Sequence, residues 1–157
     1  MAVKLTSAGV LPLVLCVGLV AGAPAANAAL GGAYDSVQAD RAHFAASLKS
    51  TAAATYTVHT LTLQNGGGVK EFARPDGTVF AVSWRGPGRP DLRQLLGGYF
   101  DTMQAENGAR AGPRHRRPLT VNHPDFVVES GGHSGAFWGL AMLPGTAPSG
   151  FSASDLR

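Results

Sequence analysis

The side chains best suited to chemistry in this sequence lie in a short glycine-rich turn. Residues 132–135 (GHSG) place Ser134 between glycines and next to a histidine, which partly matches the nucleophile elbow of serine hydrolases. The elbow needs a glycine two positions after the serine, where this chain has Ala136, and a helix where this chain reads as a strand. His123 and Asp125 are the remaining candidates, but no spacing brings them to the serine. The pattern favours a structural turn, with a hydrolase using Ser134 and a histidine as the alternative.

The histidines do not form a recognisable metal motif. The five are scattered along the chain: His43, His59, His115, His123 and His133. No pair has the four-residue helical spacing of a zinc site, and the single cysteine lies near the N-terminus. His59 and His123 would converge with His133 only if the fold brought their strands together. With no phosphate-binding loop and no dinucleotide fingerprint either, the sequence predicts no metal and no cofactor.

Two further features suggest binding surfaces. A polar loop at residues 107–118 carries arginines without any acidic residue: Arg110, Arg114, Arg116 and Arg117. The planar arginine fork suits phosphates and carboxylates, so an anionic envelope component is one conceivable partner, and a solvated loop is the alternative. Trp84 and Trp138, with Tyr56 and Phe80, are candidates for a ligand groove, although their strand periodicity favours a place in the core.

The first residues read as a secretory signal. An apolar run at 11–23 is followed by Ala26-Asn27-Ala28, a small-x-small cleavage pattern, so residues 1–28 are predicted to be removed at about Ala28/Ala29. Cys16 lies inside this segment, which leaves residues 29–157 without a disulfide, a lipid anchor or a transmembrane segment. The net charge of +3 is too mild to indicate nucleic acid binding, and export argues further against it.

A strand, a sharp turn and a helix within residues 78–100 form the centre of the predicted fold. Phe80, Val82 and Trp84 alternate, which predicts one large apolar face on a central strand. The turn GPGRP at 86–90 ends that strand because proline cannot donate to a sheet.

The helix after this turn is predicted from a cap and a stripe. Asp91 and Gln94 resemble a capping box, and an apolar stripe follows at three- and four-residue steps: Leu92, Leu95, Leu96, Tyr99 and Met103. Gly97 and Gly98 lie off the stripe; we interpret them as a site of close packing, with a bend as the alternative.

The remaining segments predict the rest of one domain. A helix begins at Asp35, with Gln38 completing a capping box, and its buried side continues to Leu48. Residues 47–54 read as the helix end and a connector. Strands are predicted at 55–63 (with a bulge or a swap of sides midway), 69–73, 78–85, 119–130 (interrupted at Pro124) and 136–143.

These elements predict an α+β domain. Its order is helix, three strands, helix, two strands, which gives a twisted antiparallel sheet of about five strands with two helices packed on it. Residues 29–157 form this single domain, and the Ser/Pro/Gly-rich composition of 144–157 is typical of a partly mobile tail.

Three runs of the sequence resemble a bacterial family catalogued as a domain of unknown function, DUF2844. They are VKEFARPDGTVFAVSWRGPGRPDLRQLLGGYF, GGHSGAFWGLAMLP and the ending PSGFSASDLR. The resemblance implies a periplasmic or secreted protein of Gram-negative bacteria and carries over no activity or ligand. Ser134 stands where the family pattern has a methionine, which weakens a catalytic interpretation of the serine. We therefore expect a non-enzymatic binding or accessory module whose partner is an envelope protein or an anionic envelope component.

Overall fold

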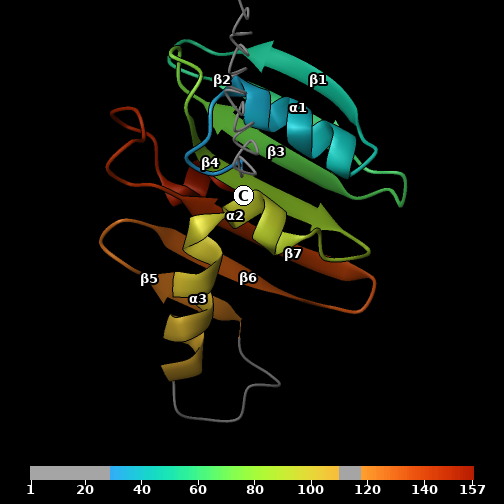
Figure 1. Ribbon diagram of the computed structural model, residues 1–157, viewed down its shortest axis with the longest axis vertical. Helices are drawn as coiled ribbons and strands as arrows, with labels where there is room; N and C mark the ends of the chain where they lie inside the picture. Colours follow the sequence, from blue (N-terminus) through green and yellow to red (C-terminus); the bar gives the residue numbers. More distant parts are fainter. Residues whose placement is uncertain (1–28, 110–117) are drawn as a thin grey trace, which may run out of the picture.

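The computed structural model describes residues 29–109 and 118–157, which fold around one antiparallel sheet of seven strands (Figure 1). The strands are β1 (Ser47–Ala52), β2 (Thr57–Thr62), β3 (Gly68–Ala73), β4 (Val79–Gly86), β5 (Leu119–Asn122), β6 (Val127–His133) and β7 (Ala136–Met142). Their spatial order is β1-β2-β3-β4-β7-β6-β5. Two meanders, β1 to β4 and β5 to β7, therefore meet where β4 pairs with β7.

The α+β class and the antiparallel sheet agree with the sequence prediction, but the count of five strands is wrong. Residues 47–54, expected to be a helix end and connector, contain the edge strand β1, whose mostly exposed side chains give no detectable alternation. Segment 119–130 is two strands, because the chain reverses around Pro124, where the His123 N–H donates to the Phe126 carbonyl at 2.9 Å. The observed order is helix, four strands, two helices, three strands and a short 3₁₀ turn.

The helical segment after β4 is broken in two. Asp91 caps α2 (Leu92–Leu96) by accepting from the backbone N–H groups of Arg93 and Gln94, as predicted. The predicted capping box is not formed, because the side chain of Gln94 donates to Asp40 instead. Gly97 then takes φ 51°, a conformation that glycine adopts without strain, and α3 (Gly98–Ala109) starts in a new direction. A Cβ on Gly98 would meet nothing within 4 Å. The predicted alternative, a bend, is therefore observed at Gly97, and the interpretation as close packing is wrong for Gly98.

The first helix, α1 (Tyr34–His43), is shorter than the sequence predicts and lacks the predicted capping box. Its N-cap is Ala33, without a side-chain cap, and Asp35 lies in the first turn. The helix ends before Ala45, which has a positive φ of 48° and redirects the chain into β1. No helix among the described residues is long and apolar enough to cross a membrane.

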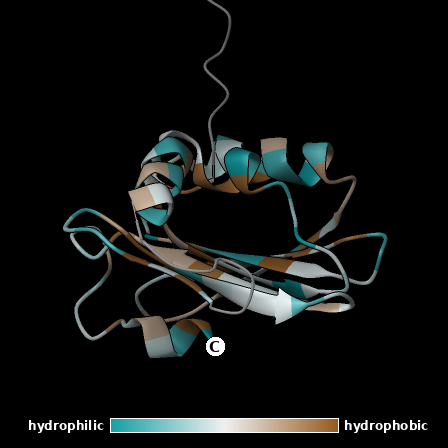
Figure 2. Cartoon of the chain, turned by 90° about the horizontal axis from the view of Figure 1, so that it is seen from below, coloured by the Kyte–Doolittle hydropathy of each residue, from teal (hydrophilic) through white to brown (hydrophobic). Residues whose placement is uncertain are grey.

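The two faces of the sheet carry different layers, as Figure 2 shows. The three α-helices cover one face and enclose the main apolar core, in which Leu95 and Leu96 are fully buried. Burying each of these leucines contributes roughly 1.5–3 kcal/mol, so the stripe on α2 is a principal attachment of the helical layer. The C-terminal segment with η1 (Ala153–Leu156) lies on the opposite face.

The central strand β4 departs from simple alternation. Phe80 is an extra residue that the pairing between β3 and β4 skips, which is a β-bulge. It therefore lies in the apolar cluster of the second face, whereas Val82 and Trp84 lie in the core under the helices. The prediction that Phe80, Val82 and Trp84 share one face is wrong for Phe80.

In strand β2 the apolar residues change from one face of the sheet to the other, as predicted, but the strand contains no bulge. Its pairing with both neighbours is regular from Thr57 to Thr62. Val58 packs on the second face, and Leu61 is buried under the helices. The strand is thus covered on one face at its start and on the other at its end.

Residues 144–157, for which the composition predicts partial mobility, lie over the second face of the sheet. The ring of Phe151 meets Phe80 edge-on, with centroids 4.8 Å apart, and Leu156 is buried. Arg157 pairs with Glu129 of β6 at 2.8 Å between Nη2 and Oε2. These contacts divide the second face into a covered half and an open half.

Candidate functional site

The open half of the second face holds the candidate site. Alternate residues of a strand share a face, so the pairing registers define rows across it. The row beneath the C-terminal segment is apolar: Val58, Phe72, Ala81 and Met142. The next row is Thr60, Lys70, Ser83, Leu140 and Glu129, and the one after it is Gly68, Arg85, Trp138 and Gly131. Their charged members are Lys70, Arg85 and Glu129, and Glu129 is paired with Arg157.

A groove of about 340 Å³ lies over these two rows. Its walls combine hydroxyl, cationic and aromatic side chains: Thr60, Lys70, Ser83, Arg85, Trp138 and Arg157. Leu156 and Arg157 form the border between the groove and the C-terminal segment. The covered half of the face is therefore apolar and filled, and the half left open is hydrophilic and positively charged.

Trp138 is the aromatic surface of the groove. A Cβ on Gly131, its partner on β6, would lie 3.0 Å from Trp138 Cζ2, so the glycine leaves the space in which the indole lies. The other neighbour of Trp138 in the sheet is Arg85, directly opposite on β4. The groove thus presents a partly exposed indole beside an exposed guanidinium.

The groove is rich in hydrogen-bond donors that no described residue satisfies. Among residues 29–109 and 118–157, neither Lys70 nor Arg85 has a carboxylate within ion-pair distance. In the same part of the chain, no side chain or backbone group bonds the hydroxyls of Thr60 and Ser83 or the Trp138 Nε1–H. Arg157, in contrast, is already paired with Glu129. The arrangement suits a ligand that brings several acceptor oxygens, at least one of them charged.

On the other face of the sheet, a pair of carboxyl groups is buried between α1 and β3. Asp40 and Glu71 both have no exposed surface. Gln94 of α2 donates from Nε2 to Asp40 Oδ1 at 2.5 Å, which ties both helices to this point. Apart from the contact between the two carboxyl groups, Asp40 Oδ2 and both oxygens of Glu71 have no partner among the described residues.

Burial keeps a proton on this pair. Desolvation, followed by the charge of Asp40 and the hydrogen bond between the two groups, raises the pKa of Glu71 to about 9. Desolvation also raises the pKa of Asp40 to about 6, although the hydrogen bond from Gln94 lowers it. Near neutral pH the pair therefore holds one proton and one negative charge, which avoids two buried like charges.

A row of polar residues leads from the sheet edge to this pair. Ser50, His59 and Glu71 lie directly opposite one another on β1, β2 and β3, and Ser50 Oγ is 2.8 Å from His59 Nδ1. Burial lowers the pKa of His59. Because its raised pKa keeps Glu71 protonated, Glu71 does not stabilise an imidazolium as the acid of a catalytic triad does. We interpret the row and the carboxyl pair as a polar connection between the layers.

The residues proposed for a hydrolase are not brought together. Ser134 is exposed in the hairpin between β6 and β7, and its carbonyl is 3.0 Å from the ring Nδ1 of His133. His123 and Asp125 lie in the turn between β5 and β6, where they form a contact of 3.6 Å. The two turns flank opposite ends of β6, about 20 Å apart for a strand of this length.

The remaining site residues predicted from the sequence lie outside the described part of the chain or within the apolar core. The arginine-rich segment with Arg110, Arg114, Arg116 and Arg117, together with His115, lies outside the described residues. Trp84 is buried under the helical layer, so it does not present its ring to the open face. In the parts of the chain that are described, no three His, Cys, Asp or Glu side chains are grouped to hold a metal ion.

Sequence reasoning missed Lys70 and Arg85 in the groove and Asp40 and Glu71 in the buried pair. A signal for the buried pair existed. Glu71 shares strand parity with the buried Val69, and Asp40 is three positions after the buried Val37 of the helix. No comparable signal existed for the groove, because its cations come from different strands.

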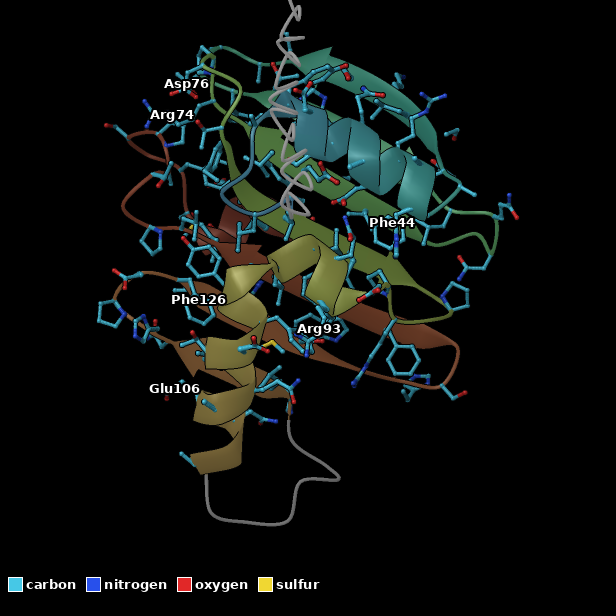
Figure 3. The ribbon with its side chains drawn as sticks, in the orientation of Figure 1. Phe44, Arg74, Asp76, Arg93, Glu106 and Phe126 are labelled. Atoms are coloured by element: carbon cyan, nitrogen blue, oxygen red, sulfur yellow. The ribbon has the colours of Figure 1, made fainter. Side chains whose placement is uncertain are left out.

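A second hollow, of about 280 Å³, lies near the hairpin between β3 and β4. Its one cation, Arg74, is paired with Asp76 at 3.4 Å, and Figure 3 shows both at this end of the sheet, away from Arg93 on the helical layer. Since its charge is already neutralised, this hollow offers less to an anion than the groove does.

The architecture and the groove define a small α+β protein with helices on one face of an antiparallel sheet and a partly open second face. Over residues 26–156 the chain matches the family described as Protein of unknown function (DUF2844), and it belongs to that family. No curated protein and no solved structure matches it.

Proposed function

We propose that this protein is an exported, non-enzymatic binding module of the bacterial cell envelope that holds an anionic envelope component in the groove. The observation that carries the proposal is the group of unpaired donors on one open sheet face, with Lys70 and Arg85 at its centre. A binding role needs only such a surface and no reacting group. The separation of Ser134 from His123 supports the same view.

The export part of the proposal rests on the N-terminal sequence, with an apolar run followed by Ala26-Asn27-Ala28. Expression of the full chain in a Gram-negative host, followed by fractionation and N-terminal sequencing, tests it. We expect a periplasmic or secreted product that begins at about Ala29. A product that keeps Met1 and stays in the cytoplasm would contradict export.

The binding part is tested with a simple polyanion. Dextran sulfate and polyacrylate are titrated into the purified protein and into the Lys70→Ser/Arg85→Ser double variant at low and moderate salt. We expect the double variant to bind at least about tenfold more weakly, because it lacks the two unpaired cations of the groove. Added salt should weaken wild-type binding to either polymer.

The matched control places the same loss of charge on the helical face. The side chain of Arg41 on α1 is exposed and bonds only to Gln38 among the described residues, and Arg93 of α2 is paired with Asp101. Arg41→Ser combined with Arg93→Ser changes the net charge by the same amount. This control should retain wild-type affinity. Equal weakening in both double variants would mean that binding follows net charge, and would overturn the assignment of the groove.

A further inference from the structure

We infer that the ligand of the groove is an acidic sugar unit, with its ring over Trp138 and its acid group on Arg85. This inference rests on the proposed function, because it names the class of anion that the same groove takes. It follows from the combination of an aromatic surface, hydroxyl groups and unpaired cations in one shallow site. Each of these elements restricts the chemistry of the ligand.

The exposed indole of Trp138 can bind a ligand that has an apolar face about the size of a ring. Trp138 lies over Gly131, which leaves part of the indole exposed in the groove. The π face carries partial negative charge, so it attracts the weakly positive C–H groups on the face of a pyranose. A simple anion such as phosphate or acetate has no such face and would leave the indole unused.

The position of Arg85 fixes where the acid group lies. Arg85 and Trp138 are directly opposite on antiparallel strands, so their Cβ atoms are about 4.5–5.5 Å apart. The two side chains therefore extend from neighbouring positions on the same face, so one ligand can contact both. The guanidinium fork binds a carboxylate or a phosphate through two parallel hydrogen bonds, and Lys70 adds a second positive charge one row away.

The remaining walls favour a hydroxyl-rich ligand over a lipid chain. Thr60 and Ser83 offer hydroxyls that both donate and accept, which suits the hydroxyls of a sugar. The apolar row of this face is already covered by the C-terminal segment, with Phe151 and Leu156 over it. An acyl chain would therefore find no apolar channel here, whereas a sugar ring needs only the one indole.

The experiment compares sugars that differ only in the acid group. Oligogalacturonate, its neutral methyl ester of the same length and polyacrylate are titrated into the wild-type protein by calorimetry, with galactose 6-phosphate as an additional arm. We expect oligogalacturonate to bind at least about tenfold more tightly than the neutral oligosaccharide. Saturable binding of galactose 6-phosphate would extend the acid group from carboxylate to phosphate.

Two variants separate the ring contact from the charge. Trp138→Leu should weaken oligogalacturonate by at least about tenfold and leave polyacrylate nearly unchanged, because only the sugar uses the indole. Arg85→Lys keeps the charge and removes the fork, and should also weaken the acidic sugar. The matched control is Arg41→Lys on the helical face, which should leave both affinities unchanged.

The indole N–H resonances of the wild-type protein give a second test that does not depend on any variant. The chain has only two tryptophans, so its indole N–H resonances are two. Oligogalacturonate should shift the resonance of Trp138 more than that of Trp84, which also borders the groove but has its side chain buried under the helices. An unshifted Trp138 resonance at saturating oligogalacturonate would overturn the inference whether or not Trp138→Leu folds.

The outcomes also separate this inference from the proposed function. If polyacrylate binds as tightly as oligogalacturonate and both depend on Arg85 but not on Trp138, the groove binds anions and the sugar assignment is wrong. If no polyanion and no acidic sugar binds in a way that depends on Lys70 and Arg85, both the sugar assignment and the proposed binding function are wrong.

Discussion

Asp40 of α1 and Glu71 of β3 meet in the interior with no exposed surface on either residue, and they share a proton between the helical layer and the sheet. The pair links the two layers through charge and hydrogen bonding, next to the polar row of Ser50 and His59. Gln94 of α2 completes the connection by donating to Asp40. The attachment of the helical layer therefore depends on pH through these two carboxyl groups.

The stability of the protein should fall as pH rises. Both carboxyl groups have folded-state pKa values, about 6 and about 9, above their ordinary values of 3.8 and 4.5. The folded state therefore binds more protons between these limits, and the stabilisation present at low pH is lost as pH rises through about 6 and then about 9. The free energy of unfolding should therefore decline as pH rises toward about 9.

Glu71→Gln tests this assignment, because the amide keeps the shape of the protonated carboxyl and does not ionise. Denaturant unfolding at about pH 7, 8 and 9 should show a flatter decline for the variant than for the wild type. His59 has the opposite effect. Because burial lowers its pKa, the folded protein loses stability as pH falls below the ordinary pKa of histidine. The two proteins are therefore compared above about pH 6. His43 and Asp91, which also act on Asp40, are unchanged in the variant. Parallel pH profiles would contradict the assignment.

Leu95→Ala should destabilise the protein by about 2–5 kcal/mol, because Leu95 is fully buried between α2 and the sheet. Chemical denaturation monitored by circular dichroism measures the loss. Glu106→Ala on the exposed side of α3 is the control and should change the free energy of unfolding by less than about 0.5 kcal/mol. A similar effect of both substitutions would mean that the apolar stripe does not hold the helical layer.

Gly139→Ala should be costly although the residue lies in a regular strand. The added Cβ would lie 2.1 Å from Trp84 Cζ2 and 2.8 Å from the Glu129 carbonyl oxygen, so the indole or the strand has to move. We expect a loss of about 1–3 kcal/mol, the usual range for overpacking. Gly145→Ala is the matched control, since its Cβ would meet nothing within 4 Å. Unfolding curves in which both variants follow the wild type would show that Trp84 does not occupy this space.

Phe151→Ala should loosen residues 144–157 from the second face. Phe151 contacts Phe80, Phe72 and Tyr56 through its ring, and these contacts hold the segment over the apolar row. Limited proteolysis followed by mass spectrometry should show faster cleavage in 144–157 for the variant than for the wild type. The exposed Ser149→Ala provides the reference. Equal cleavage rates in the three proteins would mean that the segment is already mobile, as its composition predicts.

The sequence by itself determined those features that depend on neighbouring residues. The Asp91 cap and the leucine stripe of α2 were predictable, because a cap and a helical face are local. Family membership was recognisable for the same reason, since it rests on contiguous runs of residues.

Only the tertiary structure decided the features that join distant segments. The edge strand β1 exists because β2 offers its backbone to a polar segment that has no pattern of its own. Asp40, Glu71 and Gln94 become one cluster, and Lys70, Arg85 and Trp138 become one groove, through pairing registers and helix docking. Long-range pairing depends on which surfaces exclude water together, and no short window of sequence contains that information.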